Sequence, residues 1–471
     1  MLNFAKRAAI ILILIPSIQL FPSDTVKAAT PFQDISATSA LLAEANTGEI
    51  LFEHNMRLRQ PADTLAKIMT LLLATAAIEN KEFTENDILE MTETALLDIE
   101  PGYTTQNIRQ GEEMTLLDLM YSAFTGGSSE ACNLIAEHIG GSVDEFIEMM
   151  NARAVELGCT NTHFTSAHGQ SSDDHYTTAR DQFLIFSEAM NNPLFAEITG
   201  VYRHTTEATN LSEPRRLSNT NSMLNTNGKY YFTHCTSGIV TNLYFDEIDH
   251  LSKRSFVAFA ESEGLSLVAI VFGATDKLNE DESVDMRNLT EAKRLFEWGF
   301  SQYGWRVILS SIDIVEKVPV QHGAGADFVN VSPESEVRLL LDKNIPLEAF
   351  RRDVIIYSIV NDEPLVAPVS AGDVLGEVTL TRDGVEYGPI LLVANTNVDL
   401  HSFEFIRMQI VELLSGKTAR YVMWALGILV AGYIALVVRY NVIRRKRIQR
   451  IKAARRKLAD ERQGHIRHNG D

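Results

Sequence analysis

The spacing of apolar positions divides the chain up to residue 300 into helices and strands. Helical periodicity predicts helices over 61–78, 116–138 (in two pieces), 143–157, 178–190 and 285–299. Shorter alternating runs predict a hairpin over 37–53 and strands over 233–240, 255–260 and 265–273. Because strands that must pair lie before and after the helices, the pattern predicts an α+β layer architecture.

Hydroxyl and glycine residues mark the breaks between these helices. Thr125–Ser129 contains two glycines and two serines, so we expect a loop there. Ser128 or Ser129 is expected to cap the helix that follows. Thr177 or Thr178 is expected to cap the helix over 178–190 in the same way.

The pattern of apolar and polar positions changes near Ile312. From there to Val393, short alternating runs are separated by Gly, Pro, Asp and Asn. Such runs predict a small all-β domain of sandwich type, which we place at 306–403. We place the preceding α+β domain at 29–305 and a linker at 404–420.

The N-terminal residues predict a secretory signal peptide over 1–28. Lys6 and Arg7 precede a short apolar run, and small residues follow up to Ala28 and Ala29. The run is too short to cross a bilayer, and cleavage is expected after Ala28 or one residue later. A buried helix of the mature fold is the alternative interpretation.

Residues 421–438, near the other end, are apolar throughout and uncharged. At 1.5 Å per residue, about eighteen residues reach the low end of bilayer thickness. Many Lys and Arg residues follow in 439–471, and such clusters stay on the cytoplasmic side. We therefore expect a body outside the cytoplasm, one spanning helix in the cell membrane and a basic cytoplasmic tail. The tail is either a simple stop signal or a docking site for anionic lipid.

Composition narrows the possible partners. The formal net charge is −20, and because the tail is positive, the body carries roughly −30 by subtraction. Such an acidic body argues against nucleic acid as a partner. Cys132, Cys159 and Cys235 are too few for a disulfide framework, and the first two lie in apolar contexts typical of buried thiols. No residue spacing indicates a metal site, and no cofactor is expected.

The start of the first predicted helix contains two candidate catalytic residues. Thr64 precedes Lys67 by three residues, so the two share one face of a helix. A hydroxyl and an amine in that relation can act as nucleophile and base. Alternatively, Asp63 or Thr64 only caps the helix.

Six further stretches follow one another in an order found in a known family. They are Lys67–Thr70, Ala136–Ser142, Asn161–Phe164, His168–Gly169, His175–Asp181 and Asn225–Gly228. Together they resemble the low-molecular-weight penicillin-binding proteins, which are serine-type D-alanyl-D-alanine carboxypeptidases. The resemblance covers about residues 35–300, and Ala367–Val369 with Gly372 and Gly376 resembles the family's C-terminal β domain.

The resemblance implies a penicillin-binding-protein/β-lactamase-like transpeptidase domain with three motifs in one cleft. A Ser-x-x-Lys at a helix start supplies nucleophile and base, and a Ser-x-Asn loop relays protons and binds the substrate amide. A Lys-Thr-Gly edge strand holds the terminal carboxylate. The implied reaction is covalent acyl transfer from the D-Ala-D-Ala end of a peptidoglycan stem peptide or from a β-lactam.

All three motifs are altered in this sequence. The first falls on Thr64 and Lys67, with one extra residue before the lysine. The second falls on Gly127-Ser128-Ser129, or on Ser128 and Glu130 after a one-residue shift, and the third falls on Thr236-Ser237-Gly238. The catalytic candidates are therefore Thr64, Lys67, Ser128 and Ser129, and the substrate-binding candidates are Thr236, Ser237, Gly238 and Ile239.

The backbone N–H groups of Thr64 and Ile239 are expected to form the oxyanion hole. His234 either supplies partial positive charge near neutrality or has a structural role. Losing the third-motif lysine removes a charge-assisted hydrogen bond, which is expected to weaken binding and acylation by roughly ten- to hundred-fold.

Two functions stay open at this point. The first is a membrane-anchored carboxypeptidase with weakened activity, in which Thr64 is the nucleophile and Lys67 the base. The second is a catalytically inactive homologue that binds cell-wall peptide or a partner protein as a scaffold.

Overall fold

The computed structural model describes residues 34–97, 99–241, 244–245, 252–280, 283–403, 406–407, 410 and 417–466. Side chains at 244–245, 417–420 and 457–466 are outside this description, and so is the predicted signal peptide. The chain forms two compact units, Met1–Arg306 with Leu340–Asn344 and Val307–Leu339 with Ile345–Asp471.

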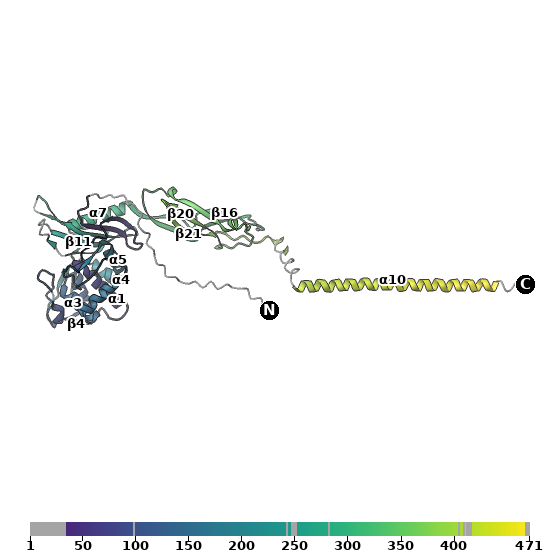
Figure 1. Cartoon of the computed structure of the whole chain (residues 1–471), viewed down its shortest axis with the longest axis horizontal. Helices are drawn as coiled ribbons and strands as arrows, with labels where there is room; N and C mark the ends of the chain where they lie inside the picture. Colours follow the sequence, from purple (N-terminus) through teal and green to yellow (C-terminus); the bar gives the residue numbers. More distant parts are fainter. Residues whose placement is uncertain are drawn as a thin grey trace. The chain divides into compact units, whose positions relative to one another are not determined.

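An antiparallel sheet forms the centre of the first unit (Figure 1). Its strands are β1 (Ser39–Glu44), β2 (Ile50–His54), β9 (Cys235–Val240), β10 (Tyr244–Phe245), β11 (Ser252–Ser262) and β12 (Leu265–Thr275). The order is β10-β11-β12-β1-β2, and β9 also pairs with β11. The predicted hairpin is confirmed as β1–β2. The predicted strand from Thr233 starts two residues later, because Thr233 and His234 lie in a turn.

Helices cover both faces of this sheet. They are α1 (Ala66–Glu79), α2 (Leu116–Phe124), α3 (Ser129–Gly140), α4 (Val143–Glu156), α5 (Ala179–Met190), α6 (Pro193–Gly200) and α7 (Arg287–Gln302). α7 packs on one face and α5 on the other. Ser128 caps α3 and Thr178 caps α5, as the sequence predicts. The sequence pattern missed α6, although Asn192 caps it and Pro193 is its first residue.

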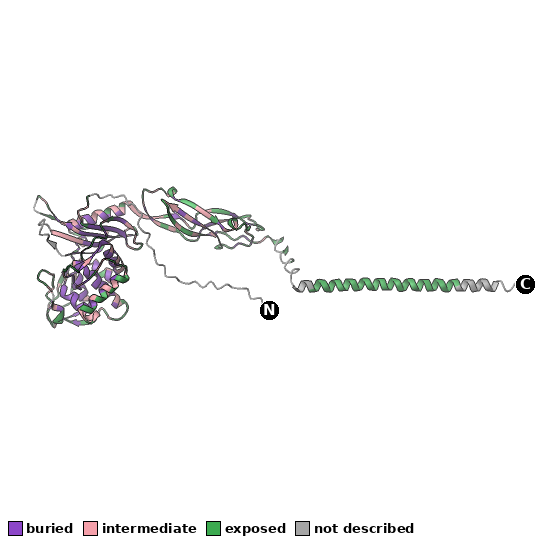
Figure 2. Ribbon diagram, in the orientation of Figure 1, coloured by how far each residue is buried: buried purple, intermediate pink, exposed green. Residues whose placement is uncertain are grey.

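Both faces of the sheet are buried, which explains the dense apolar runs of its central strands. Leu41 and Ala43 of β1 belong to the core on the α1–α6 side, and Ala40 and Leu42 belong to the core under α7. Figure 2 shows the buried residues concentrated in these layers. The sheet therefore lies between two layers of helices, which is an α+β layer architecture.

Short elements connect these layers. They are β3 (Gln60–Pro61), η1 (Asp63–Leu65), β4 (Ile88–Glu90), η2 (Thr94–Leu96), β5 (Glu113–Thr115), β6 (Tyr176–Thr177), β7 (Arg203–Thr205), β8 (Arg216–Ser218), η3 (Ser222–Leu224), β13 (Lys277–Leu278) and β14 (Val284–Asp285).

The second unit is mostly β structure. Its elements, with the two strands at which the units divide, are β15 (Tyr303–Leu309), β16 (Glu316–Pro319), β17 (Phe328–Pro333), β18 (Val337–Asp342), η4 (Leu347–Ala349), β19 (Arg351–Ile356), α8 (Tyr357–Val360), β20 (Val374–Arg382) and β21 (Val385–Ala394). Five of the strands form an antiparallel sheet in the order β16-β17-β21-β20-β19.

The last element is the long helix α10 (Lys417–Ile466). Within the described residues it is the one helix long and apolar enough to cross a membrane, over Tyr421–Arg456, with a mean hydropathy of 2.2 in its most apolar window. None of that window is buried.

Candidate active site

The 3₁₀ turn η1 carries Thr64 immediately before α1. Asp63 in this turn has a φ of 42°, in the left-handed region that Asp tolerates better than most residues. The N-cap of α1 is Leu65, so neither Asp63 nor Thr64 occupies the cap position. The helix-cap interpretation of these two residues is therefore wrong, because both lie in a separate turn ahead of the helix.

The loop around Gly169 packs directly on that turn. A Cβ at Gly169 would lie 2.1 Å from the backbone oxygen of Asp63, and its φ of 94° also favours glycine. The Ser166 hydroxyl accepts three backbone N–H bonds from this loop at 3.1–3.3 Å. The Thr70 hydroxyl of α1 donates to the backbone oxygen of Ala167 at 2.6 Å. The loop therefore holds the Thr64 turn against the start of α1.

Lys67 lies in the first turn of α1 and is only 3% exposed. Its Nζ donates a hydrogen bond to the backbone oxygen of Gly127. Burial lowers the pKa of the Lys67 amine, while nearby Cys132 and Glu130 act in the opposite direction. A buried amine with a lowered pKa is better suited to accept a proton at neutral pH.

The loop between α2 and α3 places a carbonyl group beside that amine. Gly127 turns the chain with a φ of 69°. Ser128 is the N-cap of α3, and its hydroxyl accepts a bond from the N–H of Ala131 at 3.3 Å. Ser128 and Ser129 are both fully buried. At the position where the resemblance expects a serine hydroxyl, Lys67 therefore meets a group that accepts hydrogen bonds and cannot donate them.

Alternate side chains of the edge strand β9 point to opposite sides. Thr236 is exposed, whereas Ser237 is fully buried and its hydroxyl donates to Thr199 Oγ1 at 2.7 Å. A Cβ on Gly238 would lie 2.6 Å from a backbone oxygen of β11, so this position requires glycine. Ile239 is 3% exposed with its side chain in the core. Of these four candidates, Thr236 alone is exposed.

His234 lies in the turn before β9 and packs against aromatic rings. Its ring centroid is 5.4 Å from that of Phe232 and 5.5 Å from that of Phe300. These contacts favour the structural role for His234 over the charged role.

Ionisable groups surround the Thr64 turn. Burial raises the pKa of Asp63 to about 6 and lowers that of His175 to about 4. His175 Nε2 lies 3.4 Å from the Asp63 backbone oxygen. Burial also raises the pKa of Tyr103, whose hydroxyl accepts a bond from the N–H of Ser171 at 2.6 Å. Sequence reasoning missed Tyr103 here, because no local pattern connects it to the turn.

Tertiary contacts bring the three altered motifs together. η1 contacts both α1 and β9, and α1 contacts α3. The bond from Lys67 to Gly127 joins α1 to the loop before α3. A hydroxyl, a buried amine and the backbone amides of an edge strand are the components that covalent acyl transfer requires.

A polar groove of about 740 Å³ lies beside the loop around Gly169 in the first unit. It is lined by residues of α3, α4, η2 and the 165–172 loop, including Asn133, Glu137, Asp144, His168 and Gln170. Its side chains are mostly hydroxyl, amide and carboxylate groups, which suit a ligand with hydrogen-bonding groups along its length.

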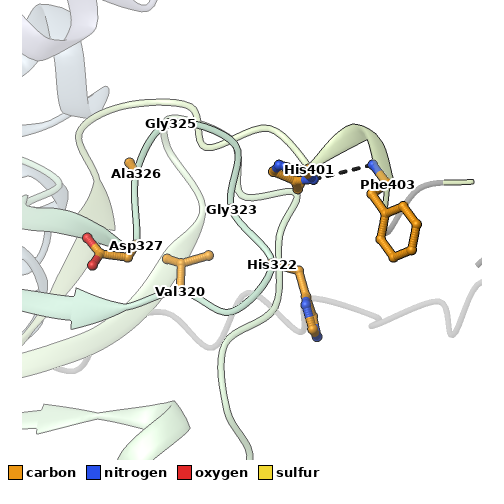
Figure 3. Close-up of a pocket in the computed structure, with 8 residues that line it drawn as sticks. All are labelled: Val320, His322, Gly323, Gly325, Ala326, Asp327, His401 and Phe403. Carbon is orange, nitrogen blue, oxygen red and sulfur yellow. Dashed lines mark hydrogen bonds between the residues drawn. The ribbon is translucent and has the colours of Figure 1, made fainter. Parts of the chain in front are cut away.

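A second hollow, of about 600 Å³, lies in the β domain (Figure 3). His401 donates its backbone N–H to the backbone oxygen of His322 at 2.8 Å, and Asp327 points away from both histidine rings. Among the residues that the structure describes, no three His, Cys, Asp or Glu side chains converge as metal ligands.

Comparison with known proteins decides the family. A family model for D-alanyl-D-alanine carboxypeptidases matches residues 24–276, more than half of the chain. The chain belongs to this family. The carboxypeptidase DacF of Bacillus subtilis is 26% identical over 351 residues, which are 74% of this chain and 82% of DacF. The carboxypeptidase DacA of Escherichia coli is 26% identical over 370 residues, covering 76% and 83%.

Solved structures show the same carboxypeptidase fold. The peptidoglycan synthesis regulatory factor PBP3 of Streptococcus pneumoniae matches with a TM-score of 0.56 and 19% identity, over 78% of this chain and all of PBP3. Penicillin-binding protein 6B of Escherichia coli gives the same TM-score and identity over 78% and 98%. The predicted fold class and family resemblance are thereby confirmed.

Proposed function

We propose that this carboxypeptidase-family protein binds the D-Ala-D-Ala ends of peptidoglycan stem peptides and transfers the acyl group slowly to Thr64. The observation that carries this proposal is the buried Lys67 amine, with its lowered pKa, in the first turn of α1 and three residues after Thr64 of η1. The substrate class is supported by the relatives, which are D-alanyl-D-alanine carboxypeptidases.

In this reaction the Thr64 hydroxyl attacks the carbonyl carbon between the two D-Ala residues, and the neutral Lys67 amine accepts the hydroxyl proton. The backbone N–H groups of Thr64 and Ile239 stabilise the oxyanion. The terminal D-Ala leaves as its nitrogen takes up the proton held by Lys67, and water then hydrolyses the Thr64 ester.

Two features make the reaction slow. The β-methyl of Thr64 restricts its χ1 angle and crowds the attacking face. Thr236, which is exposed where the family's motif has a lysine, supplies no positive charge for the terminal carboxylate.

A second candidate function is binding without acylation, and a specific observation favours it. Lys67 donates to the Gly127 carbonyl, while the Ser128 hydroxyl caps α3. A carbonyl has no proton to pass to the leaving amine. A protein of this kind would hold stem peptides in the cleft and leave them intact.

A fluorescent penicillin distinguishes the two candidates. We expect the purified protein to form a covalent adduct slowly, and Thr64→Ala to abolish it. Thr38→Ala, at a position in the strand region ahead of β1, is the control that should leave the adduct unchanged. If a folded protein forms no adduct at high penicillin concentration but still binds a D-Ala-D-Ala peptide, the binding function is correct.

We also propose the location of the protein. Residues 1–28 act as the signal peptide, residues 421–438 of α10 anchor the chain in the cell membrane, and 439–471 lie in the cytoplasm. The length and hydropathy of α10 and the basic residues after residue 438 support this arrangement.

A further inference from the structure

The polar groove beside the loop around Gly169 has no role in the acyl transfer proposed for Thr64. Its volume is about 740 Å³, which is within the range of ligand-binding sites in proteins. Residues of η2, α3, α4 and the 165–172 loop line it. None of these lining residues takes part in the proposed attack, proton transfer or oxyanion binding, so the groove requires a separate explanation.

Asn133 of α3 supplies a buried hydrogen-bond acceptor at the groove. The residue is only 4% exposed, and its amide nitrogen donates to the backbone oxygens of Ala95 at 3.2 Å and Leu97 at 3.5 Å. Both bonds use the nitrogen, so they fix the orientation of the amide. Its Oδ1 has no hydrogen-bond partner in the part of the chain that the structure describes. A buried acceptor of this kind is costly unless a donor from outside the fold satisfies it.

Three further side chains offer acceptor oxygens along the groove. Gln170 Oε1 is buried and has no partner among the described residues. Glu137 uses Oε2 to accept a bond from Thr92 Oγ1 at 2.6 Å, which leaves its Oε1 for a ligand. The Asp144 carboxylate is exposed. Neither lysine nor arginine is among the described residues that line the groove, so its two carboxylates meet no opposite charge there.

The start of α4 borders the groove as well, and the partial positive charge of a helix N-terminus acts against a cation. This charge is already compensated within the helix. The Ser142 hydroxyl accepts the backbone N–H of Glu145 at 3.2 Å, and Asp144 and Glu145 both lie in the first turn. The groove therefore favours a positively charged ligand.

One end of the groove lies close to Thr64. A Cβ on Gly169 would lie 2.7 Å from the Thr64 nitrogen, and the neighbours of Gly169 in the chain, His168 and Gln170, both line the groove. Consecutive Cα atoms are about 3.8 Å apart, so the backbone of Gln170 lies within roughly 8 Å of Thr64. A peptide residue spans up to about 3.5 Å, and a long side chain adds to this reach. A peptide with its penultimate D-Ala at Thr64 therefore reaches the groove with the side chain of the residue before it.

We propose that the groove selects stem peptides in which the residue before D-Ala-D-Ala carries a free, protonated side-chain amine. The inference rests on the proposed binding of D-Ala-D-Ala ends. An ammonium group has three N–H donors and no acceptor, which matches Asn133 Oδ1 and the Glu137 carboxylate. A ligand carboxylate would be repelled by Glu137 and Asp144, and a neutral hydroxylated ligand would leave both of them without an opposite charge.

Peptide binding to the full-length protein tests this selectivity. Three acetylated tripeptides end in D-Ala-D-Ala and begin with lysine, Nε-acetyl-lysine or norleucine. Isothermal titration calorimetry gives their Kd values on the Thr64→Ala protein, in which no acylation competes with binding. We expect the lysine peptide to bind roughly tenfold more tightly than the other two, as one charge-assisted contact provides. This advantage, which we call the amine preference, should shrink at high salt.

Isosteric variants identify the groups responsible. Glu137→Gln with Asp144→Asn should reduce the amine preference to within about twofold of unity, and Gln170→Glu, which adds a carboxylate, should increase it. Asn133→Leu removes the buried acceptor and should lower the preference by about threefold. It also removes the bonds to Ala95 and Leu97, so the other two variants test the inference where Asn133→Leu fails to fold.

Glu148→Gln is the matched control. Glu148 is an exposed residue of α4 that does not line the groove, so its loss of charge should leave the amine preference unchanged. Equal affinity for the three peptides overturns the inference and leaves the proposed function intact. An equal loss of preference in Glu148→Gln and in the Glu137 and Asp144 variant also overturns it, because the overall charge of the body would then be the cause. If no peptide binds to the folded protein, the proposed binding of D-Ala-D-Ala ends is wrong, and the inference with it.

Discussion

At the residue scale, the clearest departure from the family's motif is the uncharged Thr236 on β9. Its side chain is exposed, so a longer side chain fits without disturbing the core. We expect Thr236→Lys to lower the Kd for a D-Ala-D-Ala peptide by roughly tenfold or more, because a charge-assisted bond to the terminal carboxylate is restored. Isothermal titration calorimetry measures this change. Thr233→Lys, which adds the same charge in the exposed turn before the strand, should have little effect, and equal gains from both variants would contradict the assignment.

The raised pKa of Asp63, the neighbour of Thr64, should make the free energy of unfolding depend on pH. Burial raises its pKa to about 6 in the folded protein, so the folded state binds the proton more tightly than the unfolded chain does. Its stabilising contribution is present below the unfolded pKa of roughly 4 and is lost as the pH rises through 6. Asp63→Asn should therefore raise the free energy of unfolding at pH 7 by on the order of 2 kcal/mol and change it little near pH 4.

Urea unfolding at both pH values measures this difference. Asp87→Asn is the matched control, because hydrogen bonds from Thr84 lower the pKa of Asp87. That contribution is present above the unfolded pKa and is lost as the pH falls, so its variant should be less stable at pH 7. A stabilising effect of both substitutions would argue against burial as the cause at Asp63.

At the scale of elements, the two serines at the start of α3 are expected to differ in their contribution to stability. The Ser128 hydroxyl caps α3, whereas the buried Ser129 hydroxyl has no hydrogen-bond partner in the part of the chain that the structure describes. Ser128→Ala should lower the free energy of unfolding by about 1 kcal/mol, as expected for a lost cap, and Ser129→Ala should be close to neutral. Thermal denaturation followed by circular dichroism compares the two. A larger loss at Ser129 would show that its hydroxyl has a partner in solution.

The sequence predicted most α-helices of the first unit and most strands of its central sheet, because their patterns are local. The hairpin β1–β2, the capped helices α3 and α5 and the paired strands β11 and β12 all follow from periodicity and turn residues. The turn η1 was not predicted, since its left-handed Asp63 is held by Gly169, a residue distant in sequence.

At the scale of the whole molecule, the proposed membrane anchor predicts in which fraction the body is found. Removing residues 420–471 should release the body into the medium, because the one helix in the described residues that could span a membrane is lost. Removing only 458–471 should leave the protein in the membrane fraction. Fractionation and immunoblotting of both truncations check this, and a body that pellets with membranes after the larger deletion would reveal a second attachment.

The sequence alone determined the family and the mixed α+β class, because these depend on local spacing and on side chains that are present in the chain. It also predicted Thr64 and Lys67 on one helix face, but Thr64 lies in the turn η1 ahead of α1. Only the tertiary structure decided which atoms those side chains meet. It places a backbone carbonyl of Gly127 against the Lys67 amine and turns the Ser237 hydroxyl toward Thr199. A glycine carries no side-chain signal, and which hydroxyl faces a cleft depends on how distant segments pack.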